Sequence, residues 1–226
     1  MRQLDAAAAS VGPMDDAGVD GFLAAARTVA DLVGRPEVTR RWREESACEG
    51  MTVGGLACHL GSQLTNTVLL VGAPPSEQAP IPLLEHYDRA AWLHSPLEDD
   101  VNVAIREGSD ADAAAGPETL GALIEEQLER LPGILAGAEP RSAVLIPWQG
   151  WSLTVGDWLV TRQMEIVVHS DDLAASVAVA TPEFPDSVVT PVLALLSGVA
   201  VRRHGQVAVV RALSRPQRAP ASVSAF

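Results

Sequence analysis

The sequence contains little cysteine and no run of basic residues, and each of these absences excludes a class of protein. Its 226 residues include two cysteines, Cys48 and Cys58, too few for a fold organised by disulfide bonds. Lysine and arginine together number 16 against 29 aspartates and glutamates, for a formal net charge of −13. Because so acidic a surface repels phosphate backbones and anionic lipids, we expect neither a nucleic acid nor a membrane as the main partner.

Long hydrophobic runs are missing as well. The longest apolar run, residues 188–201, contains Pro191 and is shorter than the roughly 20 residues that cross a membrane. Residues 1–12 lack the apolar stretch of a signal peptide, which favours a cytoplasmic location. The sequence also has no nucleophile elbow for serine catalysis and no glycine loop of the kind that binds phosphate.

What the sequence does contain is helical periodicity. Hydrophobic residues make up 47% of the chain, enough for a substantial core in one domain, with room for a small C-terminal extension. Apolar side chains recur every three to four residues, the spacing of amphipathic helices, in residues 19–33, 52–71, 82–91, 117–131, 154–173 and 188–203. Because each apolar stripe must pack against another, we predict a mainly all-α fold, an antiparallel four-helix bundle with a short extra C-terminal helical segment.

Local signals refine this prediction at several points. Thr52 and Thr154 are placed to cap the helices that follow them. The acidic, alanine-rich residues 107–116 are expected to form a solvated connector, and His86, near a helix end, is expected on the surface. Two segments stay open: residues 142–148 fit a short strand or an extended loop, and residues 206–213 fit a helix or a strand.

One pair of residues carries the strongest chemical signal. Glu165 and His169 are four residues apart in a predicted helix, so both side chains lie on one face, one turn apart. A second imidazole, His59, lies in another predicted amphipathic helix. Two nitrogens and one oxygen form a ligand set that leaves a fourth position open on zinc or a similar divalent ion, as in catalytic sites. We therefore predict a metal site, although a solvated Glu–His pair and a hydrogen-bonded core histidine fit the same pattern.

Residues around this trio suggest supporting roles. Arg162 and Asp172 fall with Glu165 and His169 inside an arc of about 80° on the helix; Asp172 is placed to orient an imidazole and Arg162 to balance charge or contact an anionic substrate. Further substrate or thiol contacts are predicted from Gln63 and Asn66, on the turns after His59, and from Trp148, beside a glycine-containing loop. The amides fit solvated helix positions equally well, and the tryptophan fits a packing anchor.

Two segments resemble a known family. Residues 42–60 (WREESACEGMTVGGLACHL) and 161–174 (TRQMEIVVHSDDLA) are similar, in the right order, to motifs of the DinB/YfiT-like superfamily and, within it, of the mycothiol-dependent maleylpyruvate isomerase N-terminal domain. The resemblance spans residues 15–178 and implies a DinB-like bundle, with residues 179–226 as a C-terminal extension packing on it. It also implies zinc or another divalent ion at His59, Glu165 and His169, and mycothiol as co-substrate.

From these features we expect a metal-dependent enzyme that uses a low-molecular-weight thiol to isomerise a small electrophilic substrate or to transfer sulfur to it. The nucleophile would be a metal-bound thiolate, since only the ionised thiol attacks carbon. Two alternatives remain open. One is metal-assisted hydrolysis, with bound water as nucleophile and Asp172 as general base; the other is a non-enzymatic bundle that binds a metal or small ligand. The oligomeric state, monomer or homodimer, is open as well.

Overall fold

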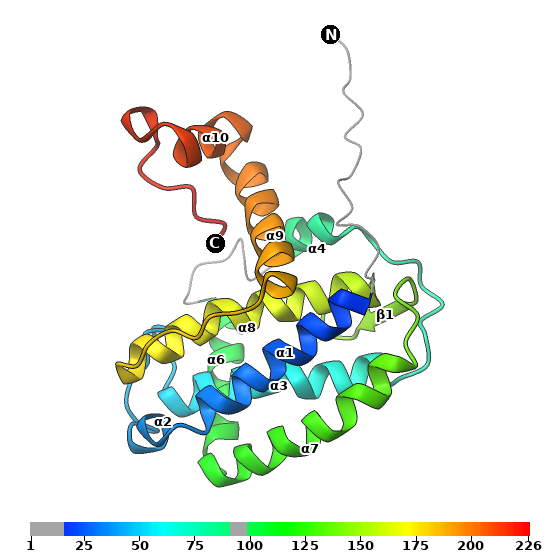
Figure 1. The fold of residues 1–226 in the computed structure, drawn as a ribbon, viewed down its shortest axis with the longest axis vertical. Helices are drawn as coiled ribbons and strands as arrows, with labels where there is room; N and C mark the ends of the chain where they lie inside the picture. Colours follow the sequence, from blue (N-terminus) through cyan, green and yellow to red (C-terminus); the bar gives the residue numbers. More distant parts are fainter. Residues whose placement is uncertain (1–15, 91–98) are drawn as a thin grey trace.

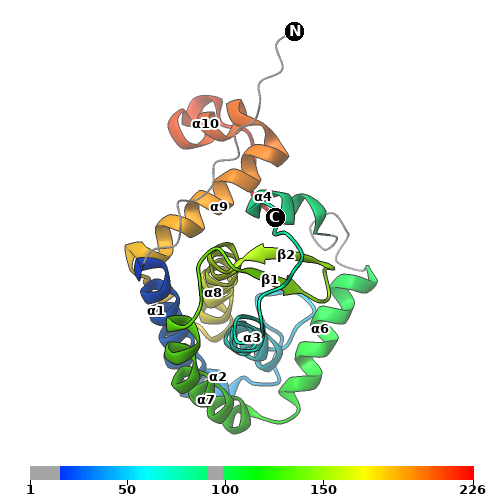
Figure 2. The same cartoon turned by 90° about the vertical axis from the view of Figure 1, so that its right-hand side faces the viewer.

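The computed structural model describes residues 16–90 and 99–226. Four long helices, α1 (Asp16–Val33), α3 (Val53–Val71), α7 (Pro117–Ala136) and α8 (Val155–Val177), form a bundle. Around this bundle α3 packs against α7 and α8, and α1 packs against the same two helices, so that each has two principal neighbours (Figures 1 and 2). The predicted fold class, a mainly α four-helix bundle, is confirmed.

The other elements surround this bundle. They are α2 (Pro36–Arg40), α4 (Leu83–Arg89), α6 (Asp100–Ala113), the strands β1 (Ala143–Ile146) and β2 (Trp151–Thr154), α9 (Asp186–His204), α10 (Gln206–Ser214) and a 3₁₀ turn, η1 (Pro216–Arg218). The two strands pair as an antiparallel hairpin, with Val144 opposite Leu153. Helix α6 packs on α3, and α9 packs across α1 and α8. None of the described helices is both long and apolar enough to span a membrane.

The predicted helix periodicity and caps explain why the two central helices begin where they do. Leu60 of α3 and Ile166 of α8 are fully buried among the apolar stripes of the bundle. The hydroxyl oxygen of Thr52 accepts a hydrogen bond from Gly55 N at 2.9 Å, and that of Thr154 accepts one from Asp157 N at 3.0 Å. Both predicted caps are confirmed, and they set the starting points of α3 and α8.

The loop before α3 is held against the bundle at two places. The Trp42 indole donates a hydrogen bond to Ala113 O at 2.9 Å and lies so close to Gly54 that a Cβ there would be 2.6 Å from the ring. At the other end, Ala47 N donates to the Ser176 hydroxyl at 2.8 Å. The first contact fastens the loop to α6 and α3, and the second fastens it to the C-terminal part of α8, which brings the half-buried Cys48 to that helix.

Two local expectations are wrong or incomplete. Most of the predicted connector 107–116 belongs to α6. One of its acidic residues has a structural partner, because an Asp110 carboxylate oxygen accepts hydrogen bonds from Thr52 N at 3.0 Å and from the Thr52 hydroxyl at 2.6 Å. The segment 142–148 contains β1, whereas its partner β2 was not predicted. Residues 206–213, open between helix and strand, are helical in α10.

Candidate metal centre

Helices α3 and α8 bring the predicted trio of ligands together. Glu165 Oε2 lies 3.3 Å from His59 Nε2 and 3.3 Å from His169 Nε2. The two imidazole rings meet edge to face, with centroids 4.8 Å apart and an interplanar angle of 89°. Residues 106 positions apart in sequence therefore present three donor atoms to one point in space.

The geometry of this trio fits a divalent cation. Zinc–nitrogen and zinc–oxygen bonds of about 2.0–2.1 Å place two ligands of a tetrahedral site about 3.3–3.4 Å apart, which agrees with both measured separations. All three donor atoms lie within 4.8 Å of one another. The three side chains are half-buried, so the point they share is partly enclosed by protein and still reachable by an incoming ligand.

The ionisable side chains of the cluster shift one another's pKa. Burial raises the pKa of Glu165, but hydrogen bonds with His169 and His59 and the nearby Arg162 charge outweigh it and hold this pKa well below its usual range. Burial lowers the pKa of His169, but hydrogen bonds to Asp172 and Glu165 outweigh it and raise this pKa to about 9. The metal-free cluster thus pairs a carboxylate with an imidazolium, and a bound cation would take the place of that proton.

Asp172 holds the imidazole ring of His169 in position. Its Oδ2 is 3.0 Å from Nδ1 of His169, while Nε2 of the same ring faces Glu165. A carboxylate on one ring nitrogen selects the tautomer and leaves the other nitrogen available as a ligand. This is the geometry expected of a residue that orients a metal-binding histidine.

Arg162 connects the trio to the hairpin end of the bundle. Its Nη1 donates a hydrogen bond to Gln63 Oε1 at 2.7 Å, and its guanidinium carbon lies 4.4 Å from the centroid of the Trp158 ring. Gln63 in turn donates from Nε2 to the His59 carbonyl at 2.7 Å. Gln63 is 1% exposed and its Nε2 also lies 3.5 Å from His59 Nε2, so it supports His59 and Arg162, and its predicted contact with a ligand stays a prediction.

The two remaining predicted contacts lie apart from the cluster. Asn66 is half-buried on α3, and Trp148 is exposed on the hairpin with its ring 6.3 Å from that of Trp158. Within residues 16–90 and 99–226, no hydrogen bond connects either side chain to the trio. A ligand large enough to extend from the trio along α8 is needed for these residues to act as contacts.

Two residues near the site were not predicted from sequence. Cys48, in the loop before α3, has its sulfur within 4.8 Å of donor atoms of both His169 and Asp172, and burial raises the pKa of its thiol. His86, expected on the surface, is 5% exposed and accepts a hydrogen bond at Nδ1 from the Trp151 indole at 3.0 Å. The expectation for His86 was wrong because β2, which supplies Trp151, had no separate signal in the sequence.

Burial of His86 makes the stability of the protein sensitive to acid. Burial, assisted by the charge of Arg162, lowers the pKa of His86 to about 4, whereas an unfolded histidine has a pKa of about 6.5. The unfolded chain therefore binds the proton first as the pH falls below about 6.5, and unfolding becomes easier. As the pH falls from 7 to 4.5, we expect the depressed pKa of His86 to lower the free energy of unfolding by about 2 kcal/mol.

The variant His86→Gln, which keeps a hydrogen-bond acceptor for Trp151, tests this expectation. Urea unfolding at both pH values should show that the free-energy difference between the native chain and the variant shrinks by about 2 kcal/mol on acidification. An equal loss of stability in both chains would contradict it.

Comparisons with known proteins place the chain in a family. Residues 22–174 match the family model described as mycothiol maleylpyruvate isomerase N-terminal domain. Among solved structures, the chain is similar to the mycothiol-dependent maleylpyruvate isomerase (TM-score 0.49) and to a histidine-to-alanine variant of that enzyme (TM-score 0.47). Both share 19% identity over 81% of this chain and 68% of the solved chain. A search of curated proteins finds no match.

Proposed function

This chain belongs to the mycothiol maleylpyruvate isomerase N-terminal domain family, an enzyme family, and on that premise we propose that it is a metal-dependent isomerase with a low-molecular-weight thiol, mycothiol, as co-substrate. Residues 15–178 would form the unit that carries the chemistry, with residues 179–226 as an extension on it. The substrate would be a small molecule with an electron-poor cis double bond.

One observation supports this proposal above the others. A single carboxylate oxygen of Glu165 lies 3.3 Å from a ring nitrogen of His59 and from one of His169, the ligand spacing of a tetrahedral zinc site with an open position. A divalent ion held by these three side chains would supply the positive charge that keeps a thiol ionised at neutral pH. Only the thiolate attacks carbon, so a half-buried site that keeps a thiol ionised suits thiol chemistry.

In the proposed reaction the substrate and the product have the same atoms, and the thiol is regenerated. The sulfur of the ionised co-substrate adds to one carbon of the double bond, and its electron pair forms the carbon–sulfur bond while the π electrons move onto the conjugated carbonyl. The carbon–carbon bond is now single and can rotate. When the same sulfur leaves with its electron pair, the double bond returns in the trans configuration and the thiol is recovered.

This chain's own residues would orient the substrate during those steps. Arg162 is stacked over Trp158 and hydrogen-bonded to Gln63, so its planar guanidinium is held in one orientation. A guanidinium is suited to carboxylates because it offers paired donors. We infer that Arg162 binds a carboxylate or the developing negative charge of the substrate, while Asp172 keeps Nε2 of His169 turned toward Glu165.

Two alternative reactions, S-transfer and hydrolysis, can be distinguished from isomerisation. S-transfer differs in the fate of the thiol, and hydrolysis differs in the position of the base that it needs. If the sulfur stays attached, the same site performs S-transfer and the thiol is consumed. Hydrolysis requires a base beside the open ligand position, and Asp172 is instead bonded to Nδ1 of His169, on the ring edge away from Glu165. The position of Asp172 therefore favours thiol chemistry over hydrolysis.

The proposal can be tested on the purified chain in three measurements. Bound metal is quantified first, mycothiol binding is then measured by calorimetry with and without a chelator, and cis–trans conversion of maleylpyruvate is followed by NMR. We expect thiol binding that needs metal, and conversion without loss of thiol. Consumption of thiol would indicate S-transfer instead, and a metal-loaded chain that binds no thiol would overturn the proposal.

The role of Asp172 gives a further expected result. Asp172→Asn keeps the size of the side chain but removes its charge, and removal of an outer partner of a ligating histidine typically costs about 10–100-fold in metal affinity. Competition with a fluorescent chelator measures this loss. Asp171→Asn is the matched control, because Asp171 is exposed and accepts a hydrogen bond from Thr181. Equal affinities for the two variants would contradict the role of Asp172.

A further inference from the structure

The C-terminal arm, residues 205–218, is carried away from the bundle by α9, whereas the end of the chain returns to the body, where Ala225 is buried and the Phe226 ring lies 6.0 Å from that of Tyr87. Within the arm, α10 makes its main contacts with α9 and with η1. Figures 1 and 2 both show α10 projecting beyond the body of the molecule at the far end of α9. Among residues 16–90 and 99–226, one side of this helix has no packing partner.

That side is apolar. Val207, Val210 and Leu213 are 61%, 54% and 77% exposed, and their spacing of three residues places them along one stripe of α10. Val209, on another side of the same helix, is buried. Large aliphatic side chains at this exposure are individually ordinary, but three in a row on a projecting helix form a surface suited to docking.

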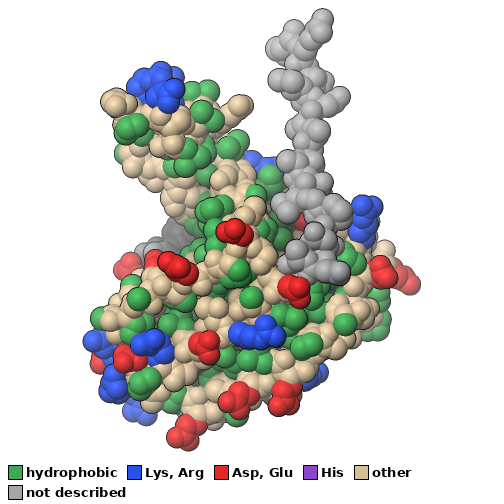
Figure 3. All heavy atoms as spheres, viewed as in Figure 1, with side chains coloured by type: hydrophobic (Ala, Val, Ile, Leu, Met, Phe, Trp, Pro, Cys, Tyr) green, Lys and Arg blue, Asp and Glu red, His purple; other side chains and the backbone are tan. Residues whose placement is uncertain are grey.

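The charge of the arm is opposite to that of the rest of the chain. The arm contains Arg211, Arg215 and Arg218 and no acidic residue, whereas residues 1–204 contain 13 arginines against 29 acidic residues, a formal charge of −16. Arginine side chains gather at the tip of the arm in Figure 3, and acidic side chains lie along the edge of the bundle formed by α7. The arm is therefore electrostatically complementary to the body of this same protein.

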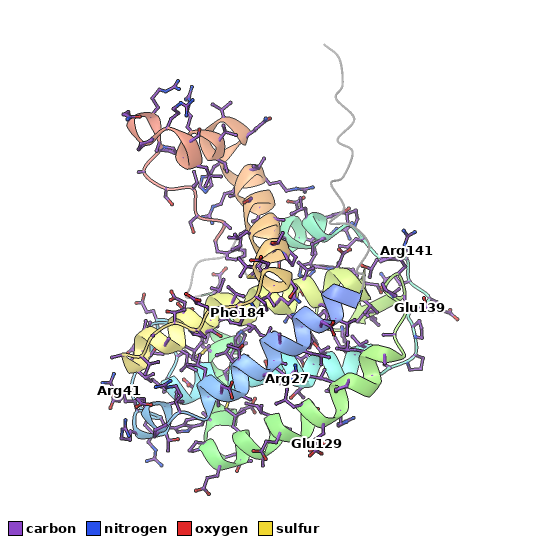
Figure 4. All side chains as sticks on the ribbon, in the orientation of Figure 1. Arg27, Arg41, Glu129, Glu139, Arg141 and Phe184 are labelled. Carbon is purple, nitrogen blue, oxygen red and sulfur yellow. The ribbon has the colours of Figure 1, made fainter. Side chains whose placement is uncertain are left out.

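An open groove on that body has a mostly apolar lining, in which Arg130 is the one charged residue, and lies beside the glutamates of α7. It lies between α3 and α7, has a volume of about 500 Å³, and is lined by Val68, Leu69, Gly72, Ala73, Arg130, Gly133 and Ile134. Leu69 is 57% exposed there. Helix α7 carries four glutamates against one arginine; Glu126 pairs with Arg130 at 3.3 Å, and Glu129 points outward from α7 (Figure 4).

We propose that the arm of one chain docks in the α3–α7 groove of a second copy, so that two chains exchange arms in a homodimer. The stripe of Val207, Val210 and Leu213 would cover the apolar floor of the groove, and arginines of the arm would pair with glutamates of α7. An anionic membrane is a weaker partner, because the stripe has three aliphatic side chains and none of the aromatic anchors common in interfacial helices. This inference does not depend on the proposed enzymatic function.

Light scattering after size exclusion, at micromolar concentration, tests the assembly directly. The chain has a mass of 23.7 kDa, so the dimer should have twice that mass. The double variant Val210→Asp and Leu213→Asp should be monomeric, as should Leu69→Asp on the groove side. Ile105→Asp is the matched control, since Ile105 is an exposed residue of α6, and this variant should remain dimeric.

Charge reversal distinguishes this interface from a general loss of stability. Arg215→Glu with Arg218→Glu should weaken the dimer at least tenfold, and adding Glu126→Arg with Glu129→Arg should restore it. The dimer should also weaken as salt rises from about 0.05 to about 0.5 M, because exposed ion pairs are screened. A monomeric native chain, a dimer that survives both aspartate variants, or a monomer that floats with anionic vesicles would each overturn the proposal.

Discussion

The variant Glu165→Gln is expected to bind less than a tenth of the metal bound by the native chain and to lose about 10³-fold or more in kcat/KM for thiol-dependent isomerisation. Glutamine has nearly the same shape, so packing around α8 is kept. It lacks the negative charge, and its amide nitrogen cannot serve as a ligand. The site would then present two neutral imidazoles and one weak carbonyl ligand to a divalent cation, too little charge and too few strong donors for tight binding.

Metal content, by plasma emission spectroscopy, and kcat/KM should be measured together for this variant. Glu126→Gln, on the exposed face of α7, is the matched control and should retain both. Circular dichroism separates loss of the site from loss of the fold. A Glu165→Gln chain that stays folded and keeps its full metal content would exclude Glu165 as a ligand, and retained metal with lost activity would move its role from binding to catalysis.

The variant Arg162→Lys should lose about 10–100-fold in kcat/KM while the bound metal is unchanged. Lysine keeps the positive charge, but a single ammonium cannot stack flat on Trp158 and donate to Gln63 at the same time. The native guanidinium does both, at 4.4 Å from the ring centroid and 2.7 Å from the amide oxygen. If Arg162 binds the carboxylate of the substrate, most of the loss should be in KM.

Steady-state kinetics with metal quantified in the same samples checks this expectation. Arg40→Lys is a suitable control, because Arg40 is an exposed residue of α2 that pairs with Glu37 at 3.3 Å. Loss of metal from the Arg162→Lys chain would show that this arginine supports the ligands through Gln63 rather than the substrate. Unchanged kcat/KM would remove Arg162 from the proposed mechanism.

The regular elements were predictable because their signals are local. Apolar residues repeat with the period of a helix, so the stripes of α1, α3, α7 and α8 are visible without coordinates. Thr52 and Thr154 could be assigned as caps because a cap depends on its own helix end. Glu165 and His169 could be placed on one face for the same reason, since an i, i+4 pair meets in any helix.

Other features depend on segments that are distant in sequence. Strand β2 has only four residues, and what makes it a strand is its pairing with β1. In the sequence alone Asp110 fits a solvated connector, because its hydrogen-bond partner Thr52 is 58 residues away. His86 is buried because Trp151 binds it from the hairpin, and Cys48 approaches His169 because Trp42 and Ala47 fasten its loop.

The candidate metal centre combines both kinds of information. Periodicity and composition alone establish an acidic helical bundle in which Glu165 and His169 share a face of one helix. They do not establish that His59 meets that face, that Gln63 is held between His59 and Arg162, or that α10 projects with an apolar stripe exposed. Those relations are set by how α3 packs against α8 and by where α9 leaves the bundle, and such packing depends on the shapes of many side chains at once, which no single stretch of sequence contains.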